Sequence, residues 1–399
     1  MEEERNMVYS RCYGTRCANN MNSKQRAQEI LSAAGVTVSG PNPWDPRVHD
    51  ERLYDRLFAE GTVAVGESYM DGWWDVEDLA EMIARVMRSN ATAAFFSMPM
   101  RQAIPLFLKS RVFNLQNTAR AFQVGEKHYD IGNNLYERML DPSMTYTCGY
   151  WKDAKSLEEA QRAKLDLICR KIGLKKGDRV LDIGCGWGSF LIYAAKEYGV
   201  QGVGLTISKE QAALARERAK GLPIDIRVQD YRTHSDGPYD HIVSIGMFEH
   251  VGHKNYRAYM ETARKLLKDD GLFLLHTIGT SKTIWRAEPW LEKHIFPNGY
   301  IPSAAQITGA IDGGWLKDSL FVIEDWHNFG ADYDRTLNEW FKNFDTAWPG
   351  LKGKYDERFY RMWKFYLLSC AGGFRSRWEH LWQIVLSPKG VSGGYTSVR

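Results

Sequence analysis

The fold is decided by one stretch, Val180-Leu181-Asp182-Ile183-Gly184-Cys185-Gly186-Trp187-Gly188. Its first four residues are mostly apolar, which is typical of a parallel strand buried on both faces of a sheet. The three alternate glycines that follow allow a tight turn and a close approach of the backbone to a ligand. Residues 189–198 then predict a helix, whose unpaired N–H groups point back at the turn.

A strand, a glycine turn and a helix indicate a site for a nucleotide-like cofactor. The spacing is neither the Gly-x-Gly-x-x-Gly of dinucleotide folds nor a phosphate loop ending in Gly-Lys-Ser/Thr. The phrase from Leu181 to Gly188 resembles motif I of the class I S-adenosylmethionine (SAM) methyltransferases. The alternative interpretation is a tight packing turn in another α/β domain.

Strands and helices alternate along the rest of this half of the chain. Strands are predicted over 202–205, 224–228, 239–245 and 271–277, with later candidates at 320–326 and 382–386. Helices are predicted over 208–220, 255–267 and 359–370. This alternation predicts a doubly wound α/β sheet with ligands at the carboxyl ends of its strands.

Composition narrows the class of protein. With 399 residues, 44% of them hydrophobic, the chain has material for one large domain and a smaller one. A net charge of +3 does not favour nucleic acid as a partner. The six cysteines show no zinc or disulfide spacing, which favours a reducing compartment and no metal site. No apolar run reaches the roughly 18 residues of a membrane span, so we expect a cytoplasmic protein, peripheral on a membrane surface at most.

The chain is expected to divide into two domains. Residues 1–118 are predicted to be a helical N-terminal domain that binds lipid or membrane, with a disordered start, and residues 119–399 the catalytic domain. Helices are predicted over 23–34, capped by Ser23, and over 50–60 and 76–87.

A basic, apolar segment suggests where the N-terminal domain meets lipid. From Met82 to Gly125 the chain has no Asp or Glu. Basic residues interleaved with large apolar ones suit a surface that contacts anionic lipid. The alternative is a helical subdomain whose positive face packs on an acidic partner. The basic residues considered are Arg85, Arg88, Arg101, Lys109, Arg111 and Arg120.

Polar residues stand where the predicted strands end. Thr206 follows the second strand in place of the acidic residue of a dinucleotide enzyme, and Gln211 is placed to contact the ribose hydroxyls. After the third strand, Asp230 can accept the adenine amino group and Tyr231 can cover the ring. Glu249 follows the fourth strand, and His276 stands at the carboxyl end of the fifth.

Taken together, the motifs of this chain resemble the cyclopropane-fatty-acyl-phospholipid synthase family. The resemblance runs from about Ala27 to Leu386 and includes 66–74, which favours the two-domain bacterial type over the shorter mycolic-acid relatives. The stretches that carry it are 126–133, 145–151, 184–188, 247–252, 275–279, 295–299, 324–333 and 369–375.

The resemblance implies transfer of a methylene group from SAM to the cis double bond of an unsaturated phospholipid, by an enzyme that forms a homodimer. A carbocation-like species then loses a proton to a base so that the ring closes. In this family the base is thought to be a bound bicarbonate ion, which the resemblance assigns to Cys148, Glu249, His276, Tyr333 and the backbone of Ile278. Direct action of Glu249 or His276 as the base is the competing mechanism.

The resemblance also implies a set of SAM-binding residues. They are Tyr146, Thr147, Asp182, Gly184, Cys185, Gly186, Gly188, Thr206, Gln211, Asp230 and Tyr231. For Tyr146 the alternative is lid packing, and for Thr206 it is a cap on the following helix. Cys370 matches a cysteine proposed to be essential in the family, although a buried structural thiol is the alternative because the reaction needs no covalent intermediate.

Two other functions fit part of the sequence. A SAM-dependent N- or C-methyltransferase acting on another amine or lipid would share the SAM half of the chain. A lipid-binding scaffold with an inactive catalytic half would not need the intact glycine turn. The joint presence of Cys148, Glu249, His276 and Tyr333 favours the cyclopropane synthase.

Overall fold

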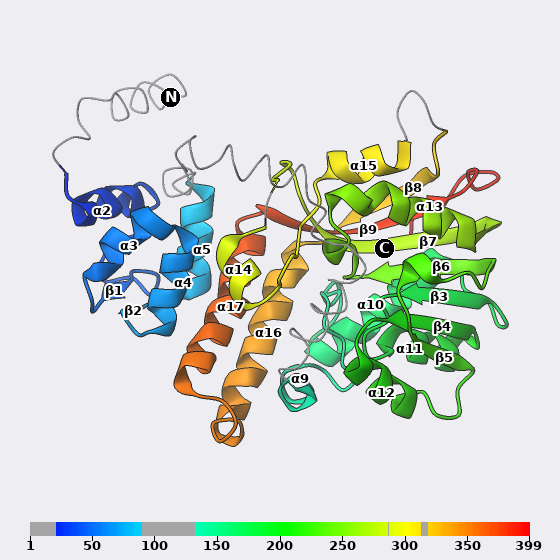
Figure 1. Cartoon of the computed structure of the whole chain (residues 1–399), viewed down its shortest axis with the longest axis horizontal. Coiled ribbons are helices and arrows are strands. Elements are labelled where there is room, and N and C mark those ends of the chain that lie inside the picture. The colour runs from blue at the N-terminus through cyan, green and yellow to red at the C-terminus, as the bar shows by residue number, and fades with distance from the viewer. Residues whose placement is uncertain (1–20, 90–131, 286, 313–317) are drawn as a thin grey trace.

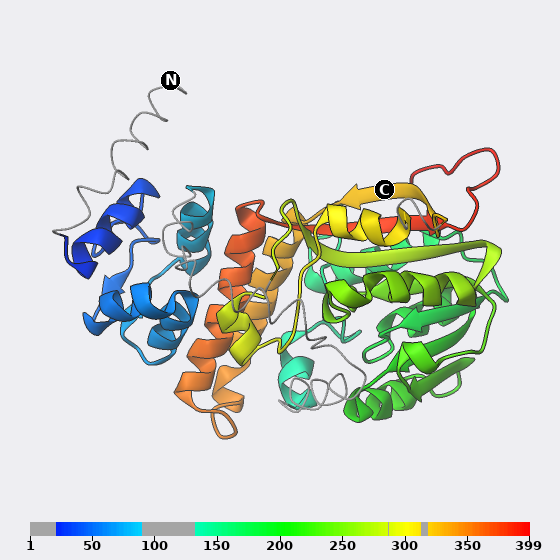
Figure 2. The ribbon, with the colours of Figure 1, turned by 45° about the horizontal axis from the view of Figure 1, so that its top comes forward.

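The computed structural model describes residues 21–89, 132–285, 287–312 and 318–399. A group of N-terminal helices lies at one end of the molecule and a sheet with its covering helices at the other (Figures 1 and 2). Two long helices, α16 and α17, stand between them. The helices of these first two groups are α2 (Ser23–Ala33), α3 (Arg52–Glu60), α4 (Thr62–Met70), α5 (Leu79–Arg88), α16 (Ala331–Ala347) and α17 (Glu357–Arg375).

The sheet has seven strands in the order β5-β4-β3-β6-β7-β9-β8. Its first five strands are parallel, and β9 runs antiparallel to both β7 and β8. Because β3 lies between β4 and β6, the strand order reverses at the glycine turn, which is where open α/β sheets bind ligands. The predicted doubly wound fold is confirmed. The strands are β3 (Arg179–Ile183), β4 (Gln201–Thr206), β5 (Ile224–Val228), β6 (Tyr239–Ile245), β7 (Leu267–Thr280), β8 (Val322–Asn328) and β9 (Glu379–Ser387).

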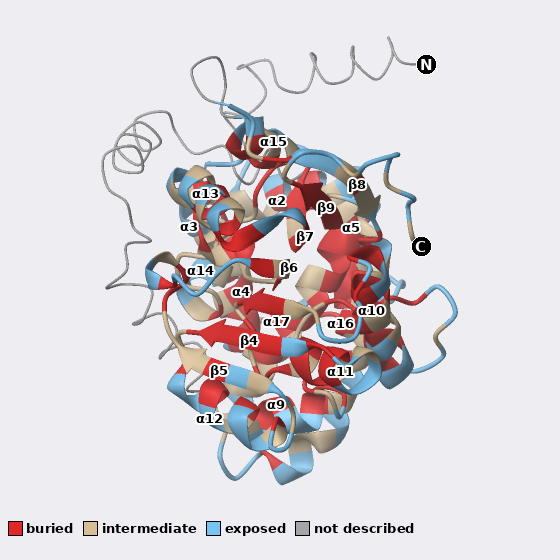
Figure 3. Ribbon diagram, turned by 90° about the vertical axis from the view of Figure 1, so that its right-hand side faces the viewer, coloured by how far each residue is buried: buried red, intermediate tan, exposed pale blue. Residues whose placement is uncertain are grey.

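Helices cover both faces of the sheet, and the central strands are buried between them (Figure 3). Val180 and Leu274 pack with helices α10, α11 and α12, whereas Leu181 packs with α13 and α15. Because successive side chains of a strand alternate between faces, Asp182 and His276 project toward the face covered by α10. These helices are α10 (Leu157–Lys171), α11 (Ser189–Tyr198), α12 (Lys209–Arg218), α13 (Tyr256–Leu266) and α15 (Ala304–Asp312).

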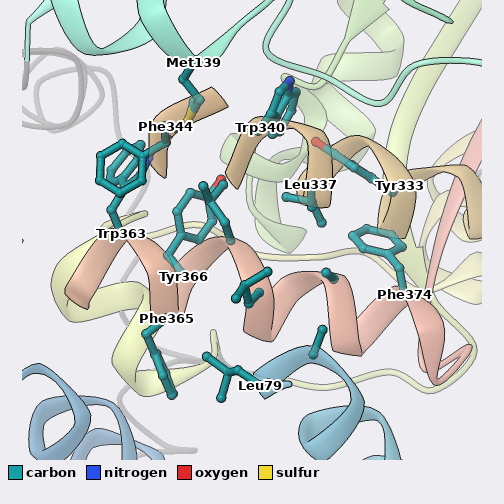
Figure 4. Close-up of a cluster of buried hydrophobic side chains, with 14 of the residues drawn as sticks. Leu79, Met139, Tyr333, Leu337, Trp340, Phe344, Trp363, Phe365, Tyr366 and Phe374 are labelled. Atoms are coloured by element: carbon teal, nitrogen blue, oxygen red, sulfur yellow. Dashed lines mark hydrogen bonds between the residues drawn. The ribbon is translucent and has the colours of Figure 1, made fainter. Parts of the chain in front are cut away.

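Aromatic side chains fill the space between α16 and α17 (Figure 4). Trp340 and Phe344 of α16 and Trp363 of α17 are fully buried there. Phe365 lies on the other side of α17, with its ring centroid 5.4 Å from that of Tyr69 in α4. The high aromatic content is therefore used in packing that joins the N-terminal helices to the sheet domain through α17.

Polar contacts strengthen the same junction. The Arg361 guanidinium of α17 donates to the carbonyl oxygens of Tyr69 and Trp74 and pairs with Asp75 at 2.8 Å. Trp74 and Asp75 form β2 (Trp74–Asp75), which pairs with β1 (Arg47–Val48). The division into domains at residue 118 stays a prediction, because 90–131 are outside the described residues.

The predicted helices occur, with shifted ends. The first helix is capped by Asn22 rather than Ser23, because the Asn22 side chain accepts the N–H of Gln25. The third predicted helix starts later, at Leu79, because Asp78 caps it. The helix predicted over 359–370 continues to Arg375. Elements not predicted include α4, α10, α16, α9 (Asn133–Met139) and α14 (Pro289–His294).

Two of the basic residues expected to meet lipid are engaged within the protein. Arg85 lies 3.7 Å above the Trp44 ring and pairs with Glu81 at 3.0 Å. Arg88 donates to the carbonyl oxygen of Arg375. In the part of the chain that the structure describes, none of the helices is long and apolar enough to span a bilayer. Outside the described residues lie the first 20 residues, the motif residues 126–131, and Arg101, Lys109, Arg111 and Arg120.

The junction between α5 and α17 leaves no room for a side chain at Gly372. A Cβ there would lie 2.6 Å from the Ala80 carbonyl oxygen and 2.8 Å from the Ile83 Cβ. We expect Gly372→Ala to lower the free energy of unfolding by about 1–3 kcal/mol through overpacking, measured by urea denaturation.

Gly309 in α15 is the matched control, because a Cβ there meets nothing within 4 Å. Gly309→Ala should stabilise the protein by about 0.5–1 kcal/mol, since alanine is the better helix former. Equal effects of the two substitutions would contradict the packing described for α17.

Candidate active site

The glycine turn opens onto free space at the carboxyl end of β3. Gly184, Gly186 and Gly188 have φ values of 90°, 52° and 81°, a region that favours glycine. The N–H groups of Gly184 and Cys185 donate to the Leu205 carbonyl oxygen of β4, which anchors the turn. A Cβ at Gly186 would meet nothing within 4 Å, so a ligand can approach the backbone here.

Asp182 lies directly before this turn and is almost fully buried. Its Oδ1 has no hydrogen-bond partner among the described residues. Burial raises the pKa of this carboxyl to about 7. A buried acceptor without a partner is costly, so the position favours a ligand that donates to it.

At the end of β4, Thr206 and Gln211 contact each other. The Thr206 hydroxyl donates to Gln211 Oε1 at 2.9 Å and accepts the N–H of Ser208 at 3.2 Å. Ser208 is the residue that caps α12, because its side chain accepts the Gln211 N–H. The alternative in which Thr206 caps that helix is therefore wrong.

At the end of β5, Asp230 and Tyr231 already have protein partners. The Asp230 carboxylate binds the Arg232 guanidinium at 2.6 Å and caps a short 3-10 turn. The Tyr231 ring is buried, 5.0 Å from Tyr259 of α13. The adenine contacts assigned to Asp230 and Tyr231 stay predictions.

The segment 145–151 is fastened to α16 on one side. The Thr336 hydroxyl accepts the Gly149 N–H at 3.1 Å and the Trp151 indole N–H at 2.9 Å. The Trp151 backbone N–H donates to Asp332 at 2.7 Å. Side chains of α16 thus hold this segment above the sheet edge.

The same segment is fastened to α10 on its other side. Gln161 donates to the Thr147 carbonyl oxygen at 2.7 Å, and Lys164 Nζ donates to the Thr147 hydroxyl at 2.9 Å. The Tyr146 hydroxyl lies 2.8 Å from that of Tyr366 in α17. Tyr146 therefore packs in the aromatic interior, and its predicted contact with SAM stays a prediction.

Glu249 and the end of β7 form the polar centre of the site. Glu249 lies in the 3-10 turn η3 (Phe248–His250) after β6, and its Oε1 accepts the Ile278 N–H at 2.7 Å. Its Oε2 is buried and has no partner among the described residues. Burial raises the pKa of Glu249 to about 7.

His276 of β7 is a neutral hydrogen-bond donor. The Gln383 amide nitrogen of β9 lies 3.3 Å from His276 Nδ1, and with that nitrogen as the donor the ring proton lies on Nε2. Burial, aided by Lys164, holds the pKa of His276 well below its usual range. Within the described structure His276 Nε2 has no partner, and its proton is available to a ligand.

Two other residues predicted to hold bicarbonate, Cys148 and Tyr333, are buried at α16, where Cys148 Sγ lies 3.9 Å from the Thr336 hydroxyl. Tyr333 of α16 is buried, and its hydroxyl lies within electrostatic range of Cys148 and Glu249. Burial raises the pKa values of Tyr333 and Cys148 well above their usual range, so both stay protonated. The Ile278 N–H donates to Glu249, and the predicted contact of the Ile278 backbone with an anion stays a prediction.

Cys370 is a partly exposed free cysteine on α17. Burial and the nearby carboxyls of Glu379 and Glu288 raise the pKa of this thiol well above its usual range. A thiol kept protonated is a poor nucleophile, which favours the structural interpretation.

Sequence reasoning missed the polar side chains that support the site. Gln161, Lys164, Thr336 and Gln383 are completely buried. Gln161 and Lys164 stand three residues apart, a spacing that puts them on one face of a helix. Two polar residues on an otherwise apolar helix face would have indicated such supporting residues, but α10 was not predicted. In the described ranges no group of three or more His, Cys, Asp or Glu side chains could hold a metal ion.

The chain is similar to a family of known enzymes. Residues 116–384 match the family model described as mycolic acid cyclopropane synthetase. The cyclopropane-fatty-acyl-phospholipid synthase of Escherichia coli K12 is 49% identical over 376 residues, which cover 94% of this chain and 95% of that protein.

Two solved structures share the fold. The cyclopropane synthase MmaA2 from Mycobacterium tuberculosis has a TM-score of 0.62 and 32% identity, covering 66% of this chain and 97% of its own. Mycolic acid cyclopropane synthase CmaA1, in complex with SAH (S-adenosylhomocysteine) and CTAB, has a TM-score of 0.60, 31% identity and the same coverage.

The raised pKa of Glu249 predicts that this carboxyl costs stability at high pH. A carboxyl that titrates near 7 when folded and near its usual value when unfolded favours the folded state less as pH rises from about 4.5 to 7. We expect Glu249→Gln to stabilise the protein at pH 8 by up to about 3 kcal/mol and to leave stability at pH 4.5 unchanged.

Urea denaturation at both pH values measures this effect, with the exposed residue Glu217 as control. Glu217→Gln should change stability little at either pH. A Glu249→Gln variant that is less stable than the parent at pH 8 would show that the ionised carboxylate stabilises the fold.

Proposed function

The chain belongs to the mycolic acid cyclopropane synthetase family, a family of SAM-dependent methyltransferases, and from this premise we propose a cyclopropane-fatty-acyl-phospholipid synthase. The enzyme transfers a methylene group from SAM to the cis double bond of unsaturated phospholipid acyl chains and releases SAH. One observation carries the ring-closing step. Within the described structure, Glu249 Oε2, just after β6, and His276 Nε2, in the neighbouring strand β7 opposite Ile245, are both buried without partners.

The residues around the glycine turn fit SAM. Gly186 faces open space, Asp182 Oδ1 lacks a partner, and Thr206 and Gln211 stand at the next strand end. Bound SAM supplies an electrophilic methyl group. The chain's own task is to orient the acceptor, exclude water and stabilise positive charge as it develops.

Aromatic ring faces are suited to stabilising the positive charge that develops in the reaction. The Tyr146 ring lies 5.1 Å from Trp340, and the Trp340 ring lies 5.9 Å from Tyr333. Ring faces attract a cation without offering a nucleophile to it. These three side chains therefore support a carbocation-like transition state while excluding water.

We assign the base to bicarbonate held between Glu249, His276, Tyr333 and Cys148. His276 Nε2–H and the Tyr333 hydroxyl can donate to an oxyanion, and the unpartnered Glu249 Oε2 can accept or give its proton. Bound bicarbonate supplies a base for the proton removed at ring closure. His276 is a weak base, because burial holds its pKa well below the usual range. Glu249, with a pKa of about 7, is the competing base.

A phospholipid substrate implies contact with a membrane surface. Ile284 and Trp285, which follow β7 in the chain, are 37% and 51% exposed. Large exposed apolar side chains suit contact with lipid. We also propose, from the family resemblance, that the protein binds the membrane peripherally on the cytoplasmic side and forms a homodimer.

Methylene transfer is tested with SAM whose methyl group is fully deuterated. The protein is incubated with it and with vesicles of unsaturated phospholipid, and the acyl chains are analysed by mass spectrometry. We expect a chain that gains a methylene with two deuterium atoms and loses its double bond, because one deuterium leaves at ring closure. A trideuterated methyl group on an amine or on a saturated carbon would identify another methyltransferase. No transfer to lipid would reject a phospholipid as the substrate.

The SAM site is tested at the open position in the glycine turn. Gly186→Asp should weaken binding of SAH about tenfold or more, because the new carboxylate occupies the space of the ligand. Isothermal titration calorimetry measures it. Gly173, also at positive φ with nothing within 4 Å of a Cβ, lies beyond α10 at the opposite edge of the sheet. Gly173→Asp should leave SAH affinity unchanged, and equal losses in both variants would place the SAM site elsewhere.

A further inference from the structure

Lys164 of α10 is a buried cation that the proposed reaction does not yet use. Its side chain is completely buried, and its Nζ donates to the Thr147 hydroxyl at 2.9 Å. Lys171, two turns later on the same helix, is also buried but pairs with Asp325 at 3.4 Å. None of the described carboxylates forms such an ion pair with Lys164. An unpaired buried charge is costly, so its presence calls for an anion.

The fold places Lys164 beside the proposed bicarbonate site. Alternation along β3 and β7 points Asp182 and His276 toward the sheet face that α10 covers. Thr147, which accepts the lysine's hydrogen bond, is the neighbour of Cys148. The lysine's charge lowers the pKa values of Cys148, Asp182 and His276, so all three lie within its electrostatic range.

Asp182 is an incomplete counter-charge for this lysine. Its pKa remains about 7 in spite of Lys164, so the carboxyl is only partly ionised at neutral pH. Its Oδ1 has no partner within the described structure, which excludes a hydrogen bond from Lys164 to that atom. Asp141 also raises the pKa of Lys164 but forms no ion pair with it among the described residues, and burial still lowers that pKa to about 8. Because neither Asp141 nor Asp182 pairs with Lys164, its positive charge is left for another anion.

The groups assigned to hold bicarbonate supply no positive charge themselves. His276 is neutral, and Tyr333 and Cys148 are protonated. Glu249 can carry only a negative charge, and its Oε1 already accepts the Ile278 N–H. A buried monoanion among these groups needs an opposite charge nearby.

We infer that Lys164 is a positioning residue that supplies the positive charge for the anion bound between Cys148, Glu249, His276 and Tyr333. This inference rests on the proposed role of bicarbonate. It gives Lys164 two connected tasks, since the lysine also holds the segment 145–151 through Thr147.

The test measures binding of bicarbonate without lipid. The thermal midpoint of the SAH-bound protein is followed as bicarbonate replaces chloride at constant ionic strength and pH, and the shift yields a dissociation constant. Lys164→Met removes the charge but keeps the length of the side chain. We expect it to raise the dissociation constant of bicarbonate about tenfold or more. Lys164→Arg keeps the charge and should stay within about threefold of the parent.

Gln161→Leu is the matched control for the structural role. Gln161 holds the same segment through the Thr147 carbonyl oxygen but carries no charge. If only the support of the segment mattered, Gln161→Leu and Lys164→Met would weaken bicarbonate binding alike, which would overturn the inference. If Lys164→Met does not fold, as judged by circular dichroism, Lys164→Gln makes the same comparison.

The outcomes separate this inference from the proposed function. A parent protein that transfers methylene but binds no bicarbonate would overturn both the bicarbonate role and the inference, while methylene transfer stands. Bicarbonate binding that is equal in the parent and Lys164→Met would overturn the role of Lys164 alone. A loss confined to the uncharged Lys164 variants, with SAH affinity retained, would support it.

Discussion

The site depends on the burial of polar groups that the protein leaves without partners. Glu249 Oε2, His276 Nε2 and Asp182 Oδ1 are all removed from water at the carboxyl edge of the sheet. Each costs free energy in the unliganded protein and becomes favourable only when a ligand supplies the missing partner. The rest of the fold excludes water from these atoms and fixes their positions.

Two layers of support maintain that burial. The Ile278 N–H and the Gln383 amide fix the orientations of Glu249 and His276 from within the sheet. From above, α10 and α16 hold the segment 145–151 through Gln161 and Thr336. Because parallel strands end at one edge, residues far apart in the chain meet there without a long loop.

The aromatic interior links the site to the N-terminal helices. Trp340 and Trp363 are buried between α16 and α17, and Phe365 projects from the far side of α17 toward α4. One helix thus packs against the site on one side and the N-terminal helices on the other. The rings proposed to support a cation near Tyr333 also belong to the packing that stabilises the fold.

Local patterns were sufficient to predict the sheet and its cofactor turn. The run from Val180 to Gly188 determined β3, the turn and α11, because strand, turn and helix signals there are short-range. Strands β5 and β6 were predicted with their observed ends, and Glu249 was placed correctly after β6. His276, by contrast, lies within β7, which continues to Thr280 because it pairs with β9. What local patterns predicted less well were helix limits such as the Asn22 cap, and α16, whose apolar face is set by its partner α17.

By itself, therefore, the sequence determined the fold class, the glycine turn and the residues that stand at the strand ends. Only the tertiary structure decided which of their atoms are satisfied and which are not. In the folded protein the Ile278 N–H donates to Glu249, and the Asp230 carboxylate pairs with Arg232. Lys164 donates to Thr147, in the segment that carries Cys148. The reason is physical: residue type and spacing determine local conformation, whereas hydrogen-bond partners and charge states depend on burial among residues distant in the chain.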